Sequence, residues 1–261
     1  MQDTLILGLL QADLHWENPE ANRIAFEKKI AQLFSSHDAI DLIVLPEMFT
    51  TGFSMNAKKL AESENGQSVN WMQQIAKKYA TAITGSLIIK DGNAFYNRLF
   101  FVFPNGSFKT YDKRHTFTLA GENKVYKKGN NRLIITYKEW KICPLICYDL
   151  RFPVWARNTQ NYDVLVYVAN WPHRRIAAWD ALLKARAIEN MCYTVGINRV
   201  GKDANDILYT GHSTVYNVLG KTLFFSKKEE TAIVTLTKNH IYELREKLGF
   251  LNDRDVFKIL P

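Results

Sequence analysis

The stretch that decides the fold reads Lys141-Ile142-Cys143-Pro144-Leu145-Ile146-Cys147-Tyr148-Asp149-Leu150-Arg151-Phe152-Pro153. An apolar run ends in Cys147, a short polar cluster follows at once, and a proline closes the segment. This pattern is typical of a buried strand whose end delivers a side chain into a pocket. We therefore predict that Cys147 is a catalytic nucleophile. Such a thiol needs a base, a cation and a cavity, which the rest of the chain must supply.

The remainder of the chain alternates between predicted strands and helices. Apolar runs at residues 5–10, 41–45 and 163–169 read as buried strands, and fully apolar strands imply that both faces of a sheet are covered. Asn18 and Pro19 are the expected cap and first residue of a helix. Residues 69–79 and 179–191 have helical spacing. We expect an α/β fold in one domain, residues 1–261, with a tail at 239–261.

Composition limits the classes of function. The chain has 261 residues, of which 47% are hydrophobic, and a formal net charge of +8. Because the lysines and arginines are spread along the chain without a long basic run, nucleic-acid binding is disfavoured. Three cysteines, with no convincing signal peptide and no apolar run of about 20 residues, indicate a soluble protein of the cytoplasm that does not bind membranes.

Polar residues follow several of the predicted strands. Glu47, Cys147 and the pair Asn170-Trp171 end buried strands, and Lys113 ends a shorter one. Ligands gather beyond the carboxyl ends of strands in open α/β sheets. A nearby lysine favours the thiolate of a cysteine and stabilises an oxyanion, and a carboxylate serves as general base and then general acid. The amide hydrogen of Tyr148 is a natural second oxyanion donor.

Each of these residues also has a purely structural interpretation. A cysteine in an apolar run is usually a small buried hydrophobe, and Cys143 and Cys192 are read in that way. The spacing of Cys143 and Cys147 is not that of a redox pair, and no His/Cys pattern predicts a metal site. No glycine-rich nucleotide motif occurs either, so we expect no cofactor.

Three blocks of sequence together resemble the nitrilase superfamily of carbon–nitrogen hydrolases. They are Leu45-Pro46-Glu47-Met48-Phe49, Tyr111-Asp112-Lys113-Arg114-His115 and Cys147-Tyr148-Asp149-Leu150-Arg151-Phe152-Pro153, in the order that the family has. The resemblance implies an α-β-β-α sandwich and a Glu–Lys–Cys triad at Glu47, Lys113 and Cys147. It places a second catalytic glutamate at Glu122. It also implies a homodimer, formed through helices beside the active site and the C-terminal tail.

Within the superfamily the chain is most similar to bacterial omega-amidases, which hydrolyse the terminal amide of 2-oxoglutaramate. The supporting blocks are residues 46–53, 168–172 and 185–190. The substrate is thus expected to be a small-molecule amide that contacts Tyr148, Trp171, His115 and Phe49, with Phe53 and Phe117 nearby. The candidates for a basic pocket wall are Arg114, His115, Arg151, Arg174 and Arg175, of which Arg151 also suits a structural role.

Three alternatives remain open at this point. Nitrile hydrolysis and N-carbamoyl amide hydrolysis use the same scaffold. A non-catalytic binding protein that keeps the fold is a rival from another class, and a basic nucleic-acid binder is the third.

Overall fold

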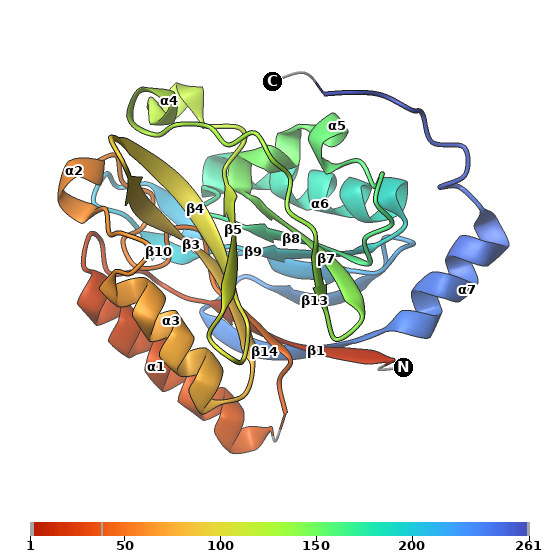
Figure 1. The fold of residues 1–261 in the computed structure, drawn as a ribbon, viewed down its shortest axis with the longest axis horizontal. Coiled ribbons are helices and arrows are strands. Elements are labelled where there is room, and N and C mark those ends of the chain that lie inside the picture. Colours follow the sequence, from red (N-terminus) through yellow and green to blue (C-terminus); the bar gives the residue numbers. More distant parts are fainter. Residues whose placement is uncertain (1–2, 38, 260–261) are drawn as a thin grey trace.

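Two six-stranded sheets face each other in the computed structural model, which describes residues 3–37 and 39–259 (Figure 1). The first sheet has the order β14 (Glu230–Thr237), β1 (Thr4–Gln11), β2 (Leu42–Val44), β3 (Ala82–Asp91), β4 (Ala94–Val102), β5 (Phe108–Asp112). The second has the order β13 (Thr222–Ser226), β12 (Ser213–Tyr216), β9 (Tyr193–Ile197), β8 (Val164–Val168), β7 (Trp140–Ile146), β6 (Ile135–Tyr137). The short strands β10 (Val200–Lys202) and β11 (Leu208–Thr210) pair separately.

Helices cover the outer faces of both sheets. The helices of the described residues are α1 (Pro19–Ser36), α2 (Ala57–Leu60), α3 (Gln67–Lys78), α4 (Glu122–Val125), α5 (Pro153–Ala156), α6 (Ile176–Asn190) and α7 (Lys238–Leu248), with 3₁₀ helices η1 (Thr118–Ala120), η2 (Cys147–Arg151) and η3 (His173–Arg175). α1 and α3 pack on the first sheet, and α6 packs on the second (Figure 1). The predicted α-β-β-α sandwich is confirmed. α7 and the chain after it project from one side of the body.

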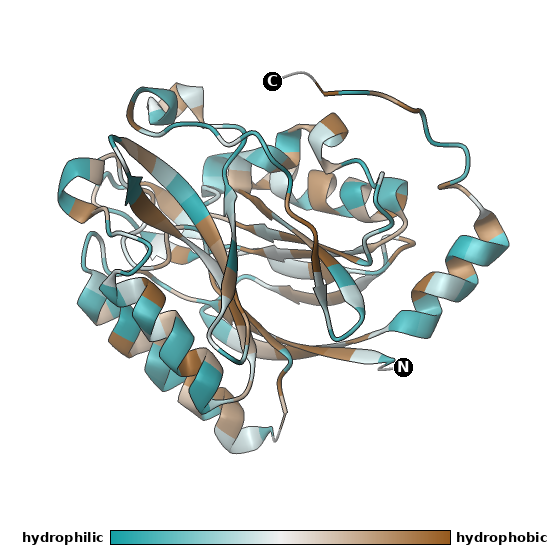
Figure 2. Cartoon of the chain, viewed as in Figure 1, coloured by the Kyte–Doolittle hydropathy of each residue, from teal (hydrophilic) through white to brown (hydrophobic). Residues whose placement is uncertain are grey.

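Alternation along the strands divides the core into layers. Phe101 of β4 belongs to the core cluster between the sheets, whereas its neighbours Phe100 and Val102 pack towards α1 and α3. Figure 2 shows hydrophobic residues concentrated along the central strands and hydrophilic ones on the outward surfaces of α1 and α3. This is the expected pattern for sheets that are buried on both faces.

Close packing of α6 depends on one glycine. A Cβ atom added to Gly196 of β9 would lie 2.4 Å from Leu183 and 2.8 Å from Trp179, both on α6. The absence of a side chain at Gly196 therefore lets the helix approach the sheet closely. This helix begins directly after η3, so its position also fixes one wall of the pocket described below.

The predicted elements differ from the structure mainly at their ends. Asn18 caps α1 as expected, with its Oδ1 accepting a hydrogen bond from the Ala21 amide at 3.1 Å. β6 begins only at Ile135, because the side chain of Arg132 donates hydrogen bonds to the carbonyls of Trp155 and Arg157. No helix in the described ranges is both long and apolar enough to cross a membrane. Residues 260–261 of the predicted tail lie outside the described residues.

The contact between the sheets yields a stability prediction. The ring of Phe101 is fully buried, and its centroid lies 5.8 Å from that of Tyr137 in the second sheet. Phe101→Ala leaves a cavity there and is expected to lower the free energy of unfolding by about 3–5 kcal/mol in chemical denaturation. Ile24→Ala, at a side chain that is 64% exposed, is the control and should change it by at most about 0.5 kcal/mol. Equal effects of the two substitutions would contradict this division into layers.

Candidate active site

The ends of four strands converge on one region of the molecule. β2, β3 and β5 run in the same direction in the first sheet, and β7 and β8 do so in the second. Glu47 follows β2, Lys113 follows β5, Cys147 follows β7 and Asn170 follows β8. The carboxyl ends of the strands thus deliver the base, the cation and the thiol to the same place, as strand ends do in other α/β folds.

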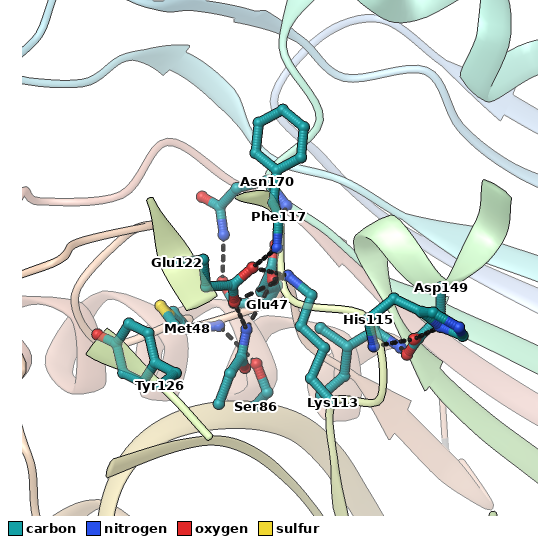
Figure 3. A network of polar contacts seen from close by, with 12 residues as sticks. Glu47, Met48, Ser86, Lys113, His115, Phe117, Glu122, Tyr126, Asp149 and Asn170 are labelled. Carbon is teal, nitrogen blue, oxygen red and sulfur yellow. Dashed lines mark hydrogen bonds and ion pairs between the residues drawn. The ribbon is translucent and has the colours of Figure 1, made fainter. Parts of the chain in front are cut away.

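A buried ion-pair cluster occupies this region. Lys113 Nζ lies 2.8 Å from Glu47 Oε1 and 2.9 Å from Glu122 Oε2 (Figure 3). The three side chains are at most 1% exposed. Removing charges from water is costly unless they are paired and hydrogen-bonded, so the three groups depend on one another.

Neutral donors complete the cluster. Asn97 Nδ2 of β4 donates to Glu47 Oε1 at 2.8 Å and to Glu122 Oε1 at 3.3 Å. The Asn170 amide donates to Glu47 Oε2 at 2.9 Å, and the Phe117 amide donates to Glu122 Oε2. Sequence reasoning missed Asn97, although an amide side chain in a largely apolar strand is a signal that could have identified it.

Burial and ion pairing have opposite effects on the pKa value of each of these groups. Burial by itself would lower the pKa of Lys113, but the charges of Glu122 and Glu47 outweigh it and raise that pKa above its usual value. Burial raises the pKa of Glu122, and the positive charge of Lys113 opposes the increase. Lys113 therefore stays a cation at all ordinary pH values and holds two carboxylates beside it.

Cys147 occupies a sharp turn between β7 and η2. Its φ of 43° is in the left-handed region, which costs a residue other than glycine about 1–3 kcal/mol. The carboxylate of Asp149 holds the turn in place. One oxygen accepts hydrogen bonds from the Ile146 amide at 3.0 Å and from the Tyr111 hydroxyl at 2.7 Å. This conformation turns the thiol out of the strand and towards Lys113.

The thiol itself is protonated in the resting state. Burial raises the pKa of Cys147 well above its usual value, the negative charge of Glu47 raises it further, and Lys113 opposes both. Attack therefore requires a base at the moment of reaction. Glu47 is the carboxylate whose charge acts on this thiol, which makes it the candidate base.

A small pocket opens above the thiol. Its lining includes Phe53, Lys113, Phe117, Ala120, Cys147, Tyr148, Arg151, Asn170, Trp171, Pro172, Arg174, Arg175, Ile207 and Tyr209. Lys113, Cys147, Tyr148 and Trp171 from the sequence prediction thus border one cavity. Glu47 and Glu122 lie beneath it, in contact with Lys113.

Two of the predicted substrate contacts lie elsewhere. Phe49 is fully buried and packs against Phe26 and Trp71, with ring centroids 5.7 and 5.8 Å away. His115 Nδ1 lies 2.7 Å from Asp149 Oδ1 (Figure 3), and its ring stacks on Phe152. The structure therefore places Phe49 in the core behind the site and His115 in the support of the Cys147 turn. Neither could be distinguished from a pocket residue by sequence position alone.

The described residues contain no group of three or more His, Cys, Asp or Glu side chains arranged to hold a metal ion. Arg114 lies beside the site, and its Nη1 donates to Asn130 Oδ1 at 2.6 Å. What the arrangement offers chemically is a nucleophile, a base, a fixed cation and a small pocket with aromatic walls. This set suits acyl transfer through a thioester.

Comparisons with known proteins agree with this chemistry. The carbon–nitrogen hydrolase family model matches residues 6–246. The chain is 41% identical over 257 residues to omega-amidase YafV of Escherichia coli strain K12, covering 98% of each chain. It is 31% identical over 255 residues to 2-oxoglutaramate amidase of Bacillus subtilis, covering 95% of this chain and 96% of the relative.

A solved structure of a related protein has the same fold. XC1258 from Xanthomonas campestris, described as a CN-hydrolase superfamily protein with an arsenic adduct in the active site, superposes with a TM-score of 0.95. Its sequence is 37% identical, and the match covers 99% of this chain and all of the other. The family model, the relatives and the two-sheet fold lead to one conclusion: the chain belongs to the carbon–nitrogen hydrolase family of the nitrilase superfamily.

Proposed function

We propose that the protein is an omega-amidase that hydrolyses the terminal amide of a small 2-oxo acid, such as 2-oxoglutaramate, and releases ammonia. Membership of the family makes it a hydrolase of carbon–nitrogen bonds. The observation that carries the proposal is the single pocket in which Cys147 and Lys113 meet, with Glu47 and Glu122 directly behind Lys113. The names of the relatives from Escherichia coli and Bacillus subtilis support the substrate class.

The first half of the reaction forms a thioester. Glu47 takes the proton of the Cys147 thiol, and the sulfur attacks the amide carbon. Lys113 and the amide of Tyr148 stabilise the oxyanion, because Tyr148 is the second residue of η2 and the first amides of a helix have no partner within it. Glu47 then gives its proton to the departing nitrogen, which leaves as ammonia.

The second half regenerates the thiol. A water molecule replaces ammonia, loses a proton to Glu47 and attacks the thioester carbon. Collapse of the intermediate releases the carboxylic acid and returns the proton to the Cys147 sulfur. Glu122 holds Lys113 together with Glu47 and orients the water, so Lys113 stabilises the oxyanions of both steps from one position.

The compartment and the assembly form part of the same proposal. All three cysteines are free, which fits a reducing compartment such as the cytoplasm. Exposed apolar side chains of α5, α6 and the tail, namely Val154, Ile188, Phe250 and Phe257, surround a shallow hollow. Apolar patches on monomers are usually small, so we assign this hollow to a homodimer contact.

The substrate class is tested by a panel. Ammonia release should be fastest from short omega-amides with a 2-oxo group, slower from the same amides without it, and slowest from a nitrile or a carbamoyl amino acid. Cys147→Ala should abolish release, whereas Cys143→Ala, at a buried packing residue, should retain it in the fraction that folds. Preference for the nitrile or the carbamoyl compound would replace the proposed substrate, and turnover by Cys147→Ala would exclude the mechanism.

Glu47→Gln separates the two roles of the carboxylate. Proton transfer is lost, so kcat/KM should fall by about 10²–10⁴-fold. The charge of Glu47 raises the pKa of Cys147, so its removal should lower that pKa and shift iodoacetamide alkylation of Cys147 to lower pH. An unchanged or higher alkylation pKa would show that Glu47 does not act on the thiol.

The dimer is tested by introducing a charge into the hollow. Ile188→Asp should convert a particle of two 30.1 kDa chains into one of a single chain in analytical ultracentrifugation. Ile24→Asp places the same charge on the exposed face of α1 and should leave the dimer intact. A wild-type protein that sediments as a monomer at micromolar concentration would exclude this assembly.

A further inference from the structure

Three arginines lie in the wall of the pocket beside Cys147. Arg151 is the last residue of η2, which Cys147 begins, and Arg174 and Arg175 belong to η3. Two separate segments therefore bring guanidinium groups to one small cavity. The mechanism above uses none of them.

These arginines differ from other arginines of the protein in their partners. Arg98 pairs with Glu64 at 2.6 Å, Asp91 at 3.1 Å and Asp112 at 2.6 Å. Across residues 3–37 and 39–259, by contrast, no hydrogen bond or ion pair joins the side chain of Arg151, Arg174 or Arg175 to another residue. A guanidinium group that has no carboxylate partner inside a pocket retains its full capacity to bind one.

Aromatic rings hold two of the three in place. The guanidinium of Arg151 lies over the ring of Trp171 at 5.0 Å, and that of Arg175 lies over the ring of Phe117 at 4.8 Å. Stacking of this kind contacts the flat face of the group and leaves its N–H edge free to donate. The rings therefore orient the arginines without using their hydrogen bonds.

The charges under the pocket explain why such groups are needed. Glu47 and Glu122 both pair with Lys113, so the charge of this lysine is already engaged. An anionic substrate that approached Cys147 therefore needs another cation. The pocket lining contains the three arginines besides Lys113 and no aspartate or glutamate, so the wall can supply that cation.

Arg175 is placed best to contact a bound anion. Arg174 is exposed to solvent, whereas Arg175 is half-buried. Burial lowers the pKa of Arg175, and the positive charges of Arg174 and Arg151 lower it further. The group still remains charged, since an arginine titrates far above neutral pH. A carboxylate beside Arg175 would reduce the electrostatic repulsion among the three arginines.

We propose that Arg175, assisted by Arg151, binds a carboxylate of the substrate and makes the enzyme selective for omega-amides that are anions. This assignment rests on the proposed amidase function for its substrate, but the electrostatic property of the pocket is measurable without turnover. Arg175 is thus a specificity-determining residue of the pocket, distinct from the groups that carry out the chemistry.

The first experiment compares succinamate with its uncharged methyl ester. Wild-type enzyme should prefer the anion in kcat/KM, and Arg175→Gln should lose about 10- to 100-fold of that preference, mainly through KM for succinamate. Arg175→Lys keeps the positive charge and should recover part of it. Lys90→Gln removes one exposed charge at the end of β3 and should leave the preference unchanged.

The second experiment uses the thiol as a probe and needs no substrate. Cys147 is alkylated with iodoacetate, an anion, and with iodoacetamide, its neutral counterpart. Arg175→Gln should lower the ratio of the two rates by a factor of 10 or more (about the loss of one charge-assisted contact), whereas Lys90→Gln should not. A purely structural effect of the substitution would change both rates together and leave their ratio as in the wild type.

The outcomes separate the two proposals. If the wild type hydrolyses none of the omega-amides, with or without a 2-oxo group, but Arg175→Gln still changes the alkylation ratio, the anion site stands and the amidase proposal fails. If the wild type hydrolyses both equally well, or if the alkylation ratio is the same in wild type and Arg175→Gln, the carboxylate site is overturned.

Discussion

The buried cluster of Lys113 with Glu47 and Glu122 is the constraint on which the rest of the structure depends. Three charges without access to water are tolerable only together, with the amides of Asn97, Asn170 and Phe117 as additional donors. Glu47 follows a strand of the first sheet and Asn170 follows a strand of the second. The cluster is therefore complete only when the two sheets have packed against each other, so the charged groups and the sandwich stabilise one another.

The turn at Cys147 is the second element that the fold must support. A cysteine with positive φ is strained, and the Asp149 carboxylate holds it through bonds to backbone and to Tyr111 of the first sheet. Backbone strain at Cys147 and a cluster of buried charges beneath it are both unfavourable locally. They persist because each is hydrogen-bonded to residues of both sheets. The geometry of the site therefore depends on the stability of the whole fold.

Much of this arrangement was predictable from the sequence. Apolar runs that end at Glu47 and Cys147, and a shorter strand that ends at Lys113, identify strands and the polar residues after them. The fold class follows from the alternation of strands and helices. Phe49 and His115 were expected to contact substrate. Each lies two positions after Glu47 or Lys113. The direction in which such a side chain points depends on the local backbone conformation, which the sequence pattern does not reveal. β13 was not predicted either, because Leu223 and Phe225 on this edge strand are exposed and interrupt the expected alternation.

The pairing of β1 with β14 has a consequence for how the protein is made. β1 lies inside the first sheet, with β2 on one side and β14 on the other, and Thr4 pairs with Thr237. During synthesis, β1 is made before β14, so its hydrogen bonds on that side form only after residues 230–237 have been made. Until then one edge of an apolar strand is open, and such edges promote aggregation.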